Sequence, residues 1–121
     1  TTNVTTMRSF ANGCKKITSI PSYNTVNCTN FTSAFSGCTL LSNVPVLSFV
    51  NVSTFNNMFA QCPNLTNTSL DNVLQSCITA TSYSGTKKLT SLGISGGTYT
   101  TERIEALPHY NDFISAGWTI A

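Results

Sequence analysis

The stretch FSGCTLLSNVP (residues 35–45), followed by NVSTFNNMF (residues 51–59), is one unit of a pattern that returns every 24 residues. Such self-similarity takes precedence over local structure in interpreting a chain. One column of equivalent positions holds cysteine and a second holds aromatic residues after an initial alanine: Cys14, Cys38 and Cys62; Ala11, Phe35, Phe59 and Tyr83. GTKKLTSL (residues 85–92) matches GCKKITSI (residues 13–20) three periods earlier and indicates a fourth unit.

Each unit also carries the spacing L-x-x-L-x-L, as in Leu41, Val44 and Val46 of the second unit and Leu65, Thr68 and Leu70 of the third. Alternation over the last three positions indicates a short strand with one buried face. The residues before it, such as Phe55 and Phe59, lie three to four apart and indicate a helical or 3-10 turn. We therefore predict an α/β solenoid, a leucine-rich-repeat-like right-handed coil with a short parallel β-sheet, short helices or 3-10 turns and a C-terminal α cap.

The predicted domain organisation is four stacked repeats followed by a cap. The repeats occupy residues 1–95, with boundaries at about 1–22, 23–46, 47–70 and 71–95, and the capping segment occupies residues 96–121. Stacked coils lie about 4.8 Å apart, so equivalent side chains should form ladders through the structure. The structural ladder that we predict consists of Cys14, Cys38, Cys62, Phe35, Phe59 and Tyr83.

The three cysteines of the ladder leave alternatives open. Adjacent coils bring two thiols within disulfide distance, and three stacked thiols could bind a metal ion. Burial as small apolar residues is the interpretation that we favour, since Val4 and Val52 occupy the positions equivalent to Cys28. We accordingly predict no metal and no cofactor.

The C-terminal segment departs from the repeat. Ser95-Gly96-Gly97 indicates a turn, and Thr100 or Thr101 should begin a helix that runs to Leu107. Pro108 should start a second helical segment, His109 to Ala116, which ends at Gly117. Leu107, Phe113, Ile114 and Trp118 are expected to pack on the fourth coil, with a last short strand at 118–120. No comparable cap precedes the first coil, so we expect further coils or another domain upstream.

Charge is scarce in this chain. Only 8% of the residues are charged, against about 25% in typical domains, while Thr, Ser and Asn make up 48 of the 121 residues. Uncharged hydrogen-bonding groups therefore keep the surface hydrated, which suits an extracellular, cell-surface or virion location. A net charge of +2 gives too little positive potential to favour nucleic acid. No apolar stretch approaches the roughly 20 residues of a membrane helix, so we expect no membrane insertion.

Catalytic equipment is also scarce, with four carboxylates and one histidine in the whole chain. Glu102, Glu105 and His109 could share a helix face and bind a metal, but Pro108 should break that helix. A Cys77–His109 pair is the one conceivable nucleophile and base. We predict that the protein is not an enzyme. Two lysine pairs, 15–16 and 87–88, are expected to be solubilising surface groups rather than a site for an anionic polymer.

The repeat quoted above resembles the BspA-type leucine-rich repeats, whose usual form is F-x-x-C-x-x-L-x-x-[IV]-P with N-V-[ST]-x-[MF] between coils. The residues that match are Phe35, Cys38, Leu41, Val44 and Pro45, followed by residues 51–59. The resemblance covers roughly residues 3–94. It implies a bacterial or protozoan surface protein that adheres to host molecules, or a phage structural protein.

The exposed strand face is the candidate binding site. Two polar columns are predicted to cross the four coils, formed by Thr18, Ser19, Ser42, Asn43, Thr66, Asn67, Thr90 and Ser91. Repeat proteins often bind partners on such a surface. The first hypothesis is a non-enzymatic binding or adhesion module, on a bacterial surface or phage virion, that recognises a host protein or glycan. The alternative is a structural spacer or assembly domain of a phage tail or head fibre, contacting other virion or surface subunits without a ligand of its own.

Overall fold

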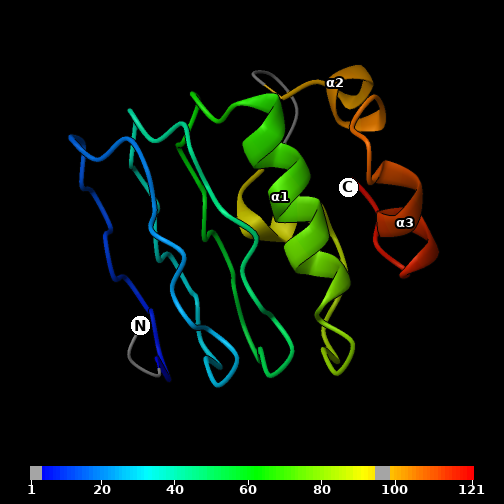
Figure 1. The fold of residues 1–121 in the computed structure, drawn as a ribbon, viewed down its shortest axis with the longest axis horizontal. Helices are drawn as coiled ribbons and strands as arrows, with labels where there is room; N and C mark the ends of the chain where they lie inside the picture. The colour runs from blue at the N-terminus through cyan, green and yellow to red at the C-terminus, as the bar shows by residue number, and fades with distance from the viewer. Residues whose placement is uncertain (1–3, 95–98) are drawn as a thin grey trace.

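The computed structural model describes residues 4–94 and 99–121. Its regular elements are helix α1 (Asn67–Ile78), the 3-10 helix η1 (Leu89–Leu92), helix α2 (Thr101–Glu105) and helix α3 (Tyr110–Ser115). The first coils lie side by side at one end of the molecule, and the helices gather at the other end (Figure 1). None of these helices is long and apolar enough to cross a membrane.

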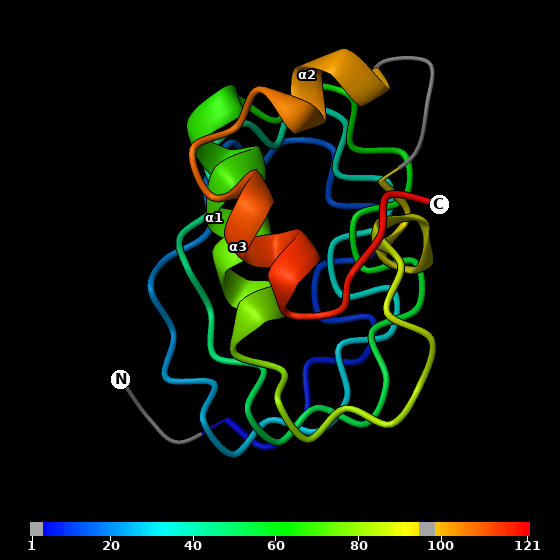
Figure 2. The same cartoon turned by 90° about the vertical axis from the view of Figure 1, so that its right-hand side faces the viewer.

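The first three coils are joined by backbone hydrogen bonds between alternate residues. Four N–H groups of the first coil, those of Met7, Ser9, Ala11 and Gly13, donate to the carbonyls of Asn30, Thr32, Ala34 and Ser36. The second coil repeats the arrangement, with Phe31, Ser33, Phe35 and Gly37 donating to Thr54, Asn56, Met58 and Ala60. Viewed along the stack, the coils superpose as nested outlines (Figure 2). Equivalent positions therefore lie next to one another over residues 4–60.

The described residues form no parallel β-sheet, and the prediction of an α/β solenoid built on one is wrong. The β-pairing between neighbouring coils in the described residues is limited to isolated parallel bridges, such as Ser19 with Asn43 and Asn30 with Thr54, and no strand forms there. One physical reason lies in the sequence itself. Pro21 and Pro45 follow directly on the apolar positions 20 and 44, and proline has no N–H to continue a ladder of hydrogen bonds.

The predicted helical turn before each strand is also wrong. Residues 8–13, 32–37 and 56–61 form tight turns instead of helix. Ser9, Ser33 and Asn57 adopt positive φ angles of 52°, 55° and 59°, in the left-handed region. The side chains that each turn buries lie three to four apart, as in Phe31, Ala34 and Cys38, while the N–H groups of alternate residues bond to the next coil. A residue spacing of this kind does not distinguish a helix from a series of turns.

Helix α1 replaces the strand that we predicted at residues 68–70. Thr66 caps it, because its hydroxyl accepts a hydrogen bond from the Ser69 N–H at 3.1 Å. The buried apolar side chains of the helix, Leu70, Val73, Leu74 and Cys77, follow helical spacing. The predicted boundary between repeats 47–70 and 71–95 therefore falls inside a helix.

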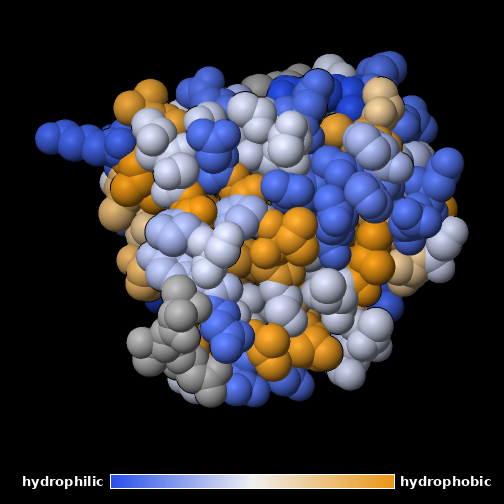
Figure 3. All heavy atoms as spheres, viewed as in Figure 1, coloured by the Kyte–Doolittle hydropathy of each residue, from blue (hydrophilic) through white to orange (hydrophobic). Residues whose placement is uncertain are grey.

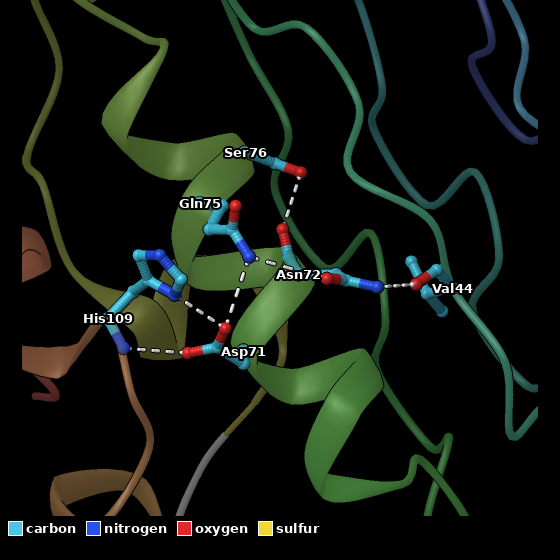
Figure 4. Close-up of polar contacts among 6 residues, drawn as sticks. All are labelled: Val44, Asp71, Asn72, Gln75, Ser76 and His109. Atoms are coloured by element: carbon cyan, nitrogen blue, oxygen red, sulfur yellow. Dashed lines mark hydrogen bonds and ion pairs between the residues drawn. The ribbon is translucent and has the colours of Figure 1, made fainter.

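A polar stripe on α1 supplies the hydrogen bonds that a neighbouring strand would have provided. Ser69 Oγ accepts from the Val44 N–H at 2.9 Å, and Asn72 Nδ2 donates to the Val44 carbonyl at 2.8 Å. Ser76 Oγ accepts from the Leu47 N–H at 2.8 Å and itself donates to the Asn72 carbonyl (Figure 4). Thr79, at the end of the helix, accepts from the Phe49 N–H at 2.7 Å. Serine, asparagine and threonine thus satisfy backbone groups of residues 44–49.

The fourth coil is displaced from the 24-residue register. The N–H groups of Asn57 and Phe59 donate to the carbonyls of Ser91 and Leu92, so the separation between the third and fourth coils exceeds 24 residues. Helix α1 takes up the extra chain. The sequence match between residues 13–20 and 85–92 is therefore not a structural equivalence.

The C-terminal cap largely follows the prediction. Thr100 caps α2 by accepting from the Arg103 N–H at 3.2 Å, and Gly117 follows α3 with a φ of 92°. Leu107, Phe113 and Trp118 are buried, as expected, but Ile114 is 41% exposed and its predicted packing is wrong. Residues 118–120 form one bridge, Lys88 with Thr119, rather than a strand. The turn predicted at 95–97 lies outside the described residues.

Candidate interaction surface

The structure brings six of the eight predicted face residues together. The Ser42 N–H donates to the Thr18 carbonyl at 3.0 Å, and the Thr66 N–H donates to the Ser42 carbonyl at 3.1 Å. Ser19 is bridged to Asn43. Five of the six side chains are exposed, and that of Ser42 is half-buried. We call the six residues the polar face: Thr18, Ser19, Ser42, Asn43, Thr66 and Asn67. Backbone bonds between coils hold these hydroxyl and amide groups in a fixed arrangement.

Thr90 and Ser91 do not extend the polar face. They lie in η1, half-buried, where the Thr90 N–H donates to the Ile120 carbonyl and the Ser91 carbonyl accepts from Asn57. Helix α1 has shifted the fourth coil out of register, so the columns end at the third coil.

Arg103 borders the polar face, and the sequence alone gave no reason to select it. Its Nε donates to Asn67 Oδ1 at 2.6 Å, and its Nη2 donates to the Leu65 carbonyl at 2.8 Å. The guanidinium also lies over the Tyr99 ring, 5.2 Å from the ring centroid. A hollow of about 330 Å³ opens here between α1 and α2, lined by Asn67, Thr68, Asp71, Arg103 and residues 106–108. The face therefore ends in a fixed positive charge.

A second, more apolar hollow lies on the first coil. Its volume is about 300 Å³, and its lining residues include Phe10, Ala11, Cys14, Ile17, Tyr23 and Phe35. Phe10 is 56% exposed and packs edge-on against Tyr23, with ring centroids 5.7 Å apart. Hydrophobic residues reach the surface at the left-hand edge of the face in Figure 3, over the first coil. We call this recess the coil 1 hollow.

The predicted ladder residues lie together in part. Cys38 Sγ donates to the Ala11 carbonyl at 3.1 Å, and Cys62 Sγ donates to the Phe35 carbonyl at 3.0 Å, one coil further on. The Phe35 and Phe59 rings stack with centroids 5.9 Å apart. Tyr83 instead contacts Phe55 and Trp118. Cys14 is exposed, and the cysteines of the described residues are unpaired and form no metal-binding cluster with other ligands.

Burial makes the cysteines unequal in reactivity. Desolvation raises the pKa of Cys62 to about 11 and raises the pKa values of Cys28, Cys38 and Cys77 as well. A thiolate is the nucleophile in alkylation, so a raised pKa and burial both slow the reaction. Cys14 should thus be the reactive thiol.

We expect iodoacetamide at pH 8 to modify Cys14 first in the native protein. The other four cysteines should react on the order of a hundredfold or more slowly, because their exposure requires local unfolding of the stack. Peptide mapping by mass spectrometry over a time course measures each rate, and the same reaction in denaturant is the control. Comparable native rates for Cys14 and Cys62 would contradict the described burial.

His109 is engaged with Asp71 rather than with the glutamates. Its backbone N–H donates to Asp71 Oδ1 at 2.8 Å, and its Nδ1 lies 2.7 Å from Asp71 Oδ2 (Figure 4). Gln75 Nε2 donates to the same carboxylate oxygen at 3.1 Å. Cys77 is completely buried within α1, so its thiol is not available to pair with His109 as nucleophile and base. Asp71 therefore connects the cap to α1.

The two lysine pairs lie in different surroundings. Lys15 and Lys16 are exposed beside the coil 1 hollow, whereas Lys87 Nζ donates to the Ala116 carbonyl at 3.3 Å. They do not form one continuous positive patch.

No known protein family, curated protein or solved structure matches this chain.

Proposed function

We propose that this chain is a non-enzymatic binding module, displayed on a cell surface or virion, whose polar face contacts a host protein or glycan. The observation that carries the proposal is the alignment of exposed hydroxyl and amide groups over three hydrogen-bonded coils. These groups both donate and accept hydrogen bonds, so they fit a partner rich in neutral polar groups.

Rigidity favours this use of the polar face. Thr18, Ser42 and Thr66 are joined through their backbones, and Ser42 Oγ also donates to the Thr18 carbonyl at 3.2 Å. A surface that is already ordered loses little conformational entropy when a partner binds. Arg103, held in place by Asn67 and Leu65, adds one positive charge at the edge of the face and suits a partner with an acidic group nearby.

A structural spacer remains the second candidate function. It is favoured by the one-sided cap: α2 and α3 pack against α1, and the carbonyls of Thr119 and Ile120 accept from η1, while the first coil keeps an apolar hollow open to solvent. A segment with one open end is suited to be part of a longer stack. In that role the polar face would be a hydrated surface without a ligand.

Replacing Asn43 with lysine tests the binding proposal. Asn43 is exposed at the centre of the polar face, so a long cationic side chain should obstruct contact without affecting the core. We expect affinity to fall about tenfold or more, as it does for central interface positions. Binding is measured on an array of neutral and acidic glycans and on purified extracellular matrix proteins.

The matched control is Ser82→Lys, which adds the same charge at an exposed position outside the polar face. Circular dichroism of both variants verifies that they fold. Equal binding by Asn43→Lys and Ser82→Lys would refute the polar face as the site. Binding of the parent protein to none of the probes would favour the spacer.

A further inference from the structure

The coil 1 hollow consists of positions that are buried in the next two coils. Phe10 is 56% exposed, while Ala34 and Met58, its equivalents one and two coils further on, are each 0% exposed. Cys14 is exposed, while Cys38 and Cys62 are buried; Ile17 is half-buried, while Leu41 and Leu65 are buried. In the second and third coils, the preceding coil covers these positions.

An edge of backbone carbonyls accompanies the hollow. The carbonyls of Asn30, Thr32, Ala34 and Ser36 accept N–H groups from the first coil. Their equivalents on the first coil are those of Thr6, Arg8, Phe10 and Asn12, and within the described residues no backbone N–H donates to them. An occupant must therefore supply N–H donors on alternate residues together with apolar side chains.

We infer that the coil 1 hollow is a stacking site for one more coil of the same 24-residue pattern, joined directly ahead of Val4. Such a coil presents the donors and apolar side chains that the first coil presents to the second. Cys14 could then donate its thiol to a carbonyl of the added coil, as Cys38 donates to Ala11 and Cys62 to Phe35. The inference extends an interface that already occurs twice in the molecule.

A second copy of this chain is a poorer occupant. Its fourth coil is covered, because Leu89 and Thr90 donate to the carbonyls of Thr119 and Ile120. Only the first coil of the second copy is therefore open for stacking. In that arrangement the exposed carbonyls of one first coil would face those of the other, with no N–H donors between them. Arg8, Lys15 and Lys16 would also approach their counterparts, and residues 1–70 contain no acidic side chain to offset them.

The test inserts a copy of residues 28–51 immediately before Val4, so that the junction of Asn51 with Val4 imitates that of Asn51 with Val52. In the inserted copy, Cys28→Val and Cys38→Ser remove both thiols, so the insert adds no reactive cysteine and the alkylation rate of Cys14 reports whether the hollow is covered. We expect Cys14 alkylation to slow on the order of tenfold or more relative to the 121-residue chain. The urea midpoint of unfolding should also rise. The matched control carries an insert of the same composition in scrambled order.

A second comparison keeps the inference testable if the extended chain gains little stability. Phe10→Asp should have a small effect in the 121-residue chain, where the side chain is 56% exposed. In the extended chain it would introduce a charge at the new interface and abolish the protection of Cys14. Equal Cys14 rates with the repeat insert and the scrambled insert would overturn the inference. The inference would also be overturned if Cys14 of the 121-residue chain were alkylated more slowly at higher protein concentration, because a second copy would then be the occupant.

Discussion

Replacing Phe55 with alanine is expected to destabilise the protein by about 3–5 kcal/mol, the usual cost of removing a buried phenylalanine. Phe55 is 0% exposed and connects the coils to the cap. Its ring lies 5.5 Å from Phe49, 4.6 Å from Tyr83 and 5.5 Å from Trp118, between centroids. Most domains have only about 5–15 kcal/mol of stability, so the variant should be marginally folded.

The measurement is urea unfolding followed by the fluorescence of Trp118, the only tryptophan of the chain. Leu40→Ala is the control, because Leu40 is 52% exposed and its loss should cost less than about 1 kcal/mol. If both variants unfold at the same urea concentration, the aromatic cluster does not join the coils to the cap.

Replacing Asp71 with alanine is expected to cost about 2–3 kcal/mol, because it removes three hydrogen bonds to one carboxylate. Two of them come from His109 and one from Gln75, and Asp71 itself is only 7% exposed. The loss should be concentrated in the contact between α1 and α3. Hydrogen exchange of α3 amides, read together with urea unfolding, locates it.

Asp112→Ala is the matched control, since Asp112 is an exposed acid in the first turn of α3. Its removal should cost less than about 1 kcal/mol. His109→Ala should have an intermediate effect, because it removes the ring contact but keeps the backbone N–H that donates to Asp71. Equal effects of Asp71→Ala and Asp112→Ala would show that the carboxylate does not hold the cap.

The sequence predicted stacking better than it predicted secondary structure. The equal spacing of Cys14, Cys38 and Cys62 gives the length of a coil, and the coil length determines which residues of adjacent coils lie next to one another. It does not decide whether a segment is strand or turn, because a tight turn and a helix both direct apolar side chains inward at intervals of three or four. The left-handed residues Ser9 and Ser33 carry no clear signal in their type.

Helix α1 was missed because the repeat suggested another structure there. Leu65, Thr68 and Leu70 were assigned to the L-x-x-L-x-L strand, although Thr66 can cap a helix and residues 67–78 contain no glycine or proline. No sequence pattern marks the serines of this helix as buried. Ser69 and Ser76 are 2% exposed, and their hydroxyls bond to the backbone of the neighbouring coil. Such a role depends on tertiary contacts that no local pattern contains.

The C-terminal helices were predictable because their signals are local. Thr100, Pro108 and Gly117 mark helix boundaries by their own stereochemistry, whatever lies nearby. The candidate site was predictable only as far as the 24-residue register holds. The six residues of the polar face lie together, whereas α1 displaces Thr90 and Ser91 from that face. Arg103 reaches the edge of the face from the cap.

The three hydrogen-bonded coils differ in how many neighbours each one has. The second and third are enclosed on both sides, whereas the first has a neighbour on one side only within the described residues. In a linear array, the free energy of opening a unit grows with the number of interfaces it must break. In the 121-residue chain, the first coil should therefore open more often than the second and third, and proteases should cleave there first.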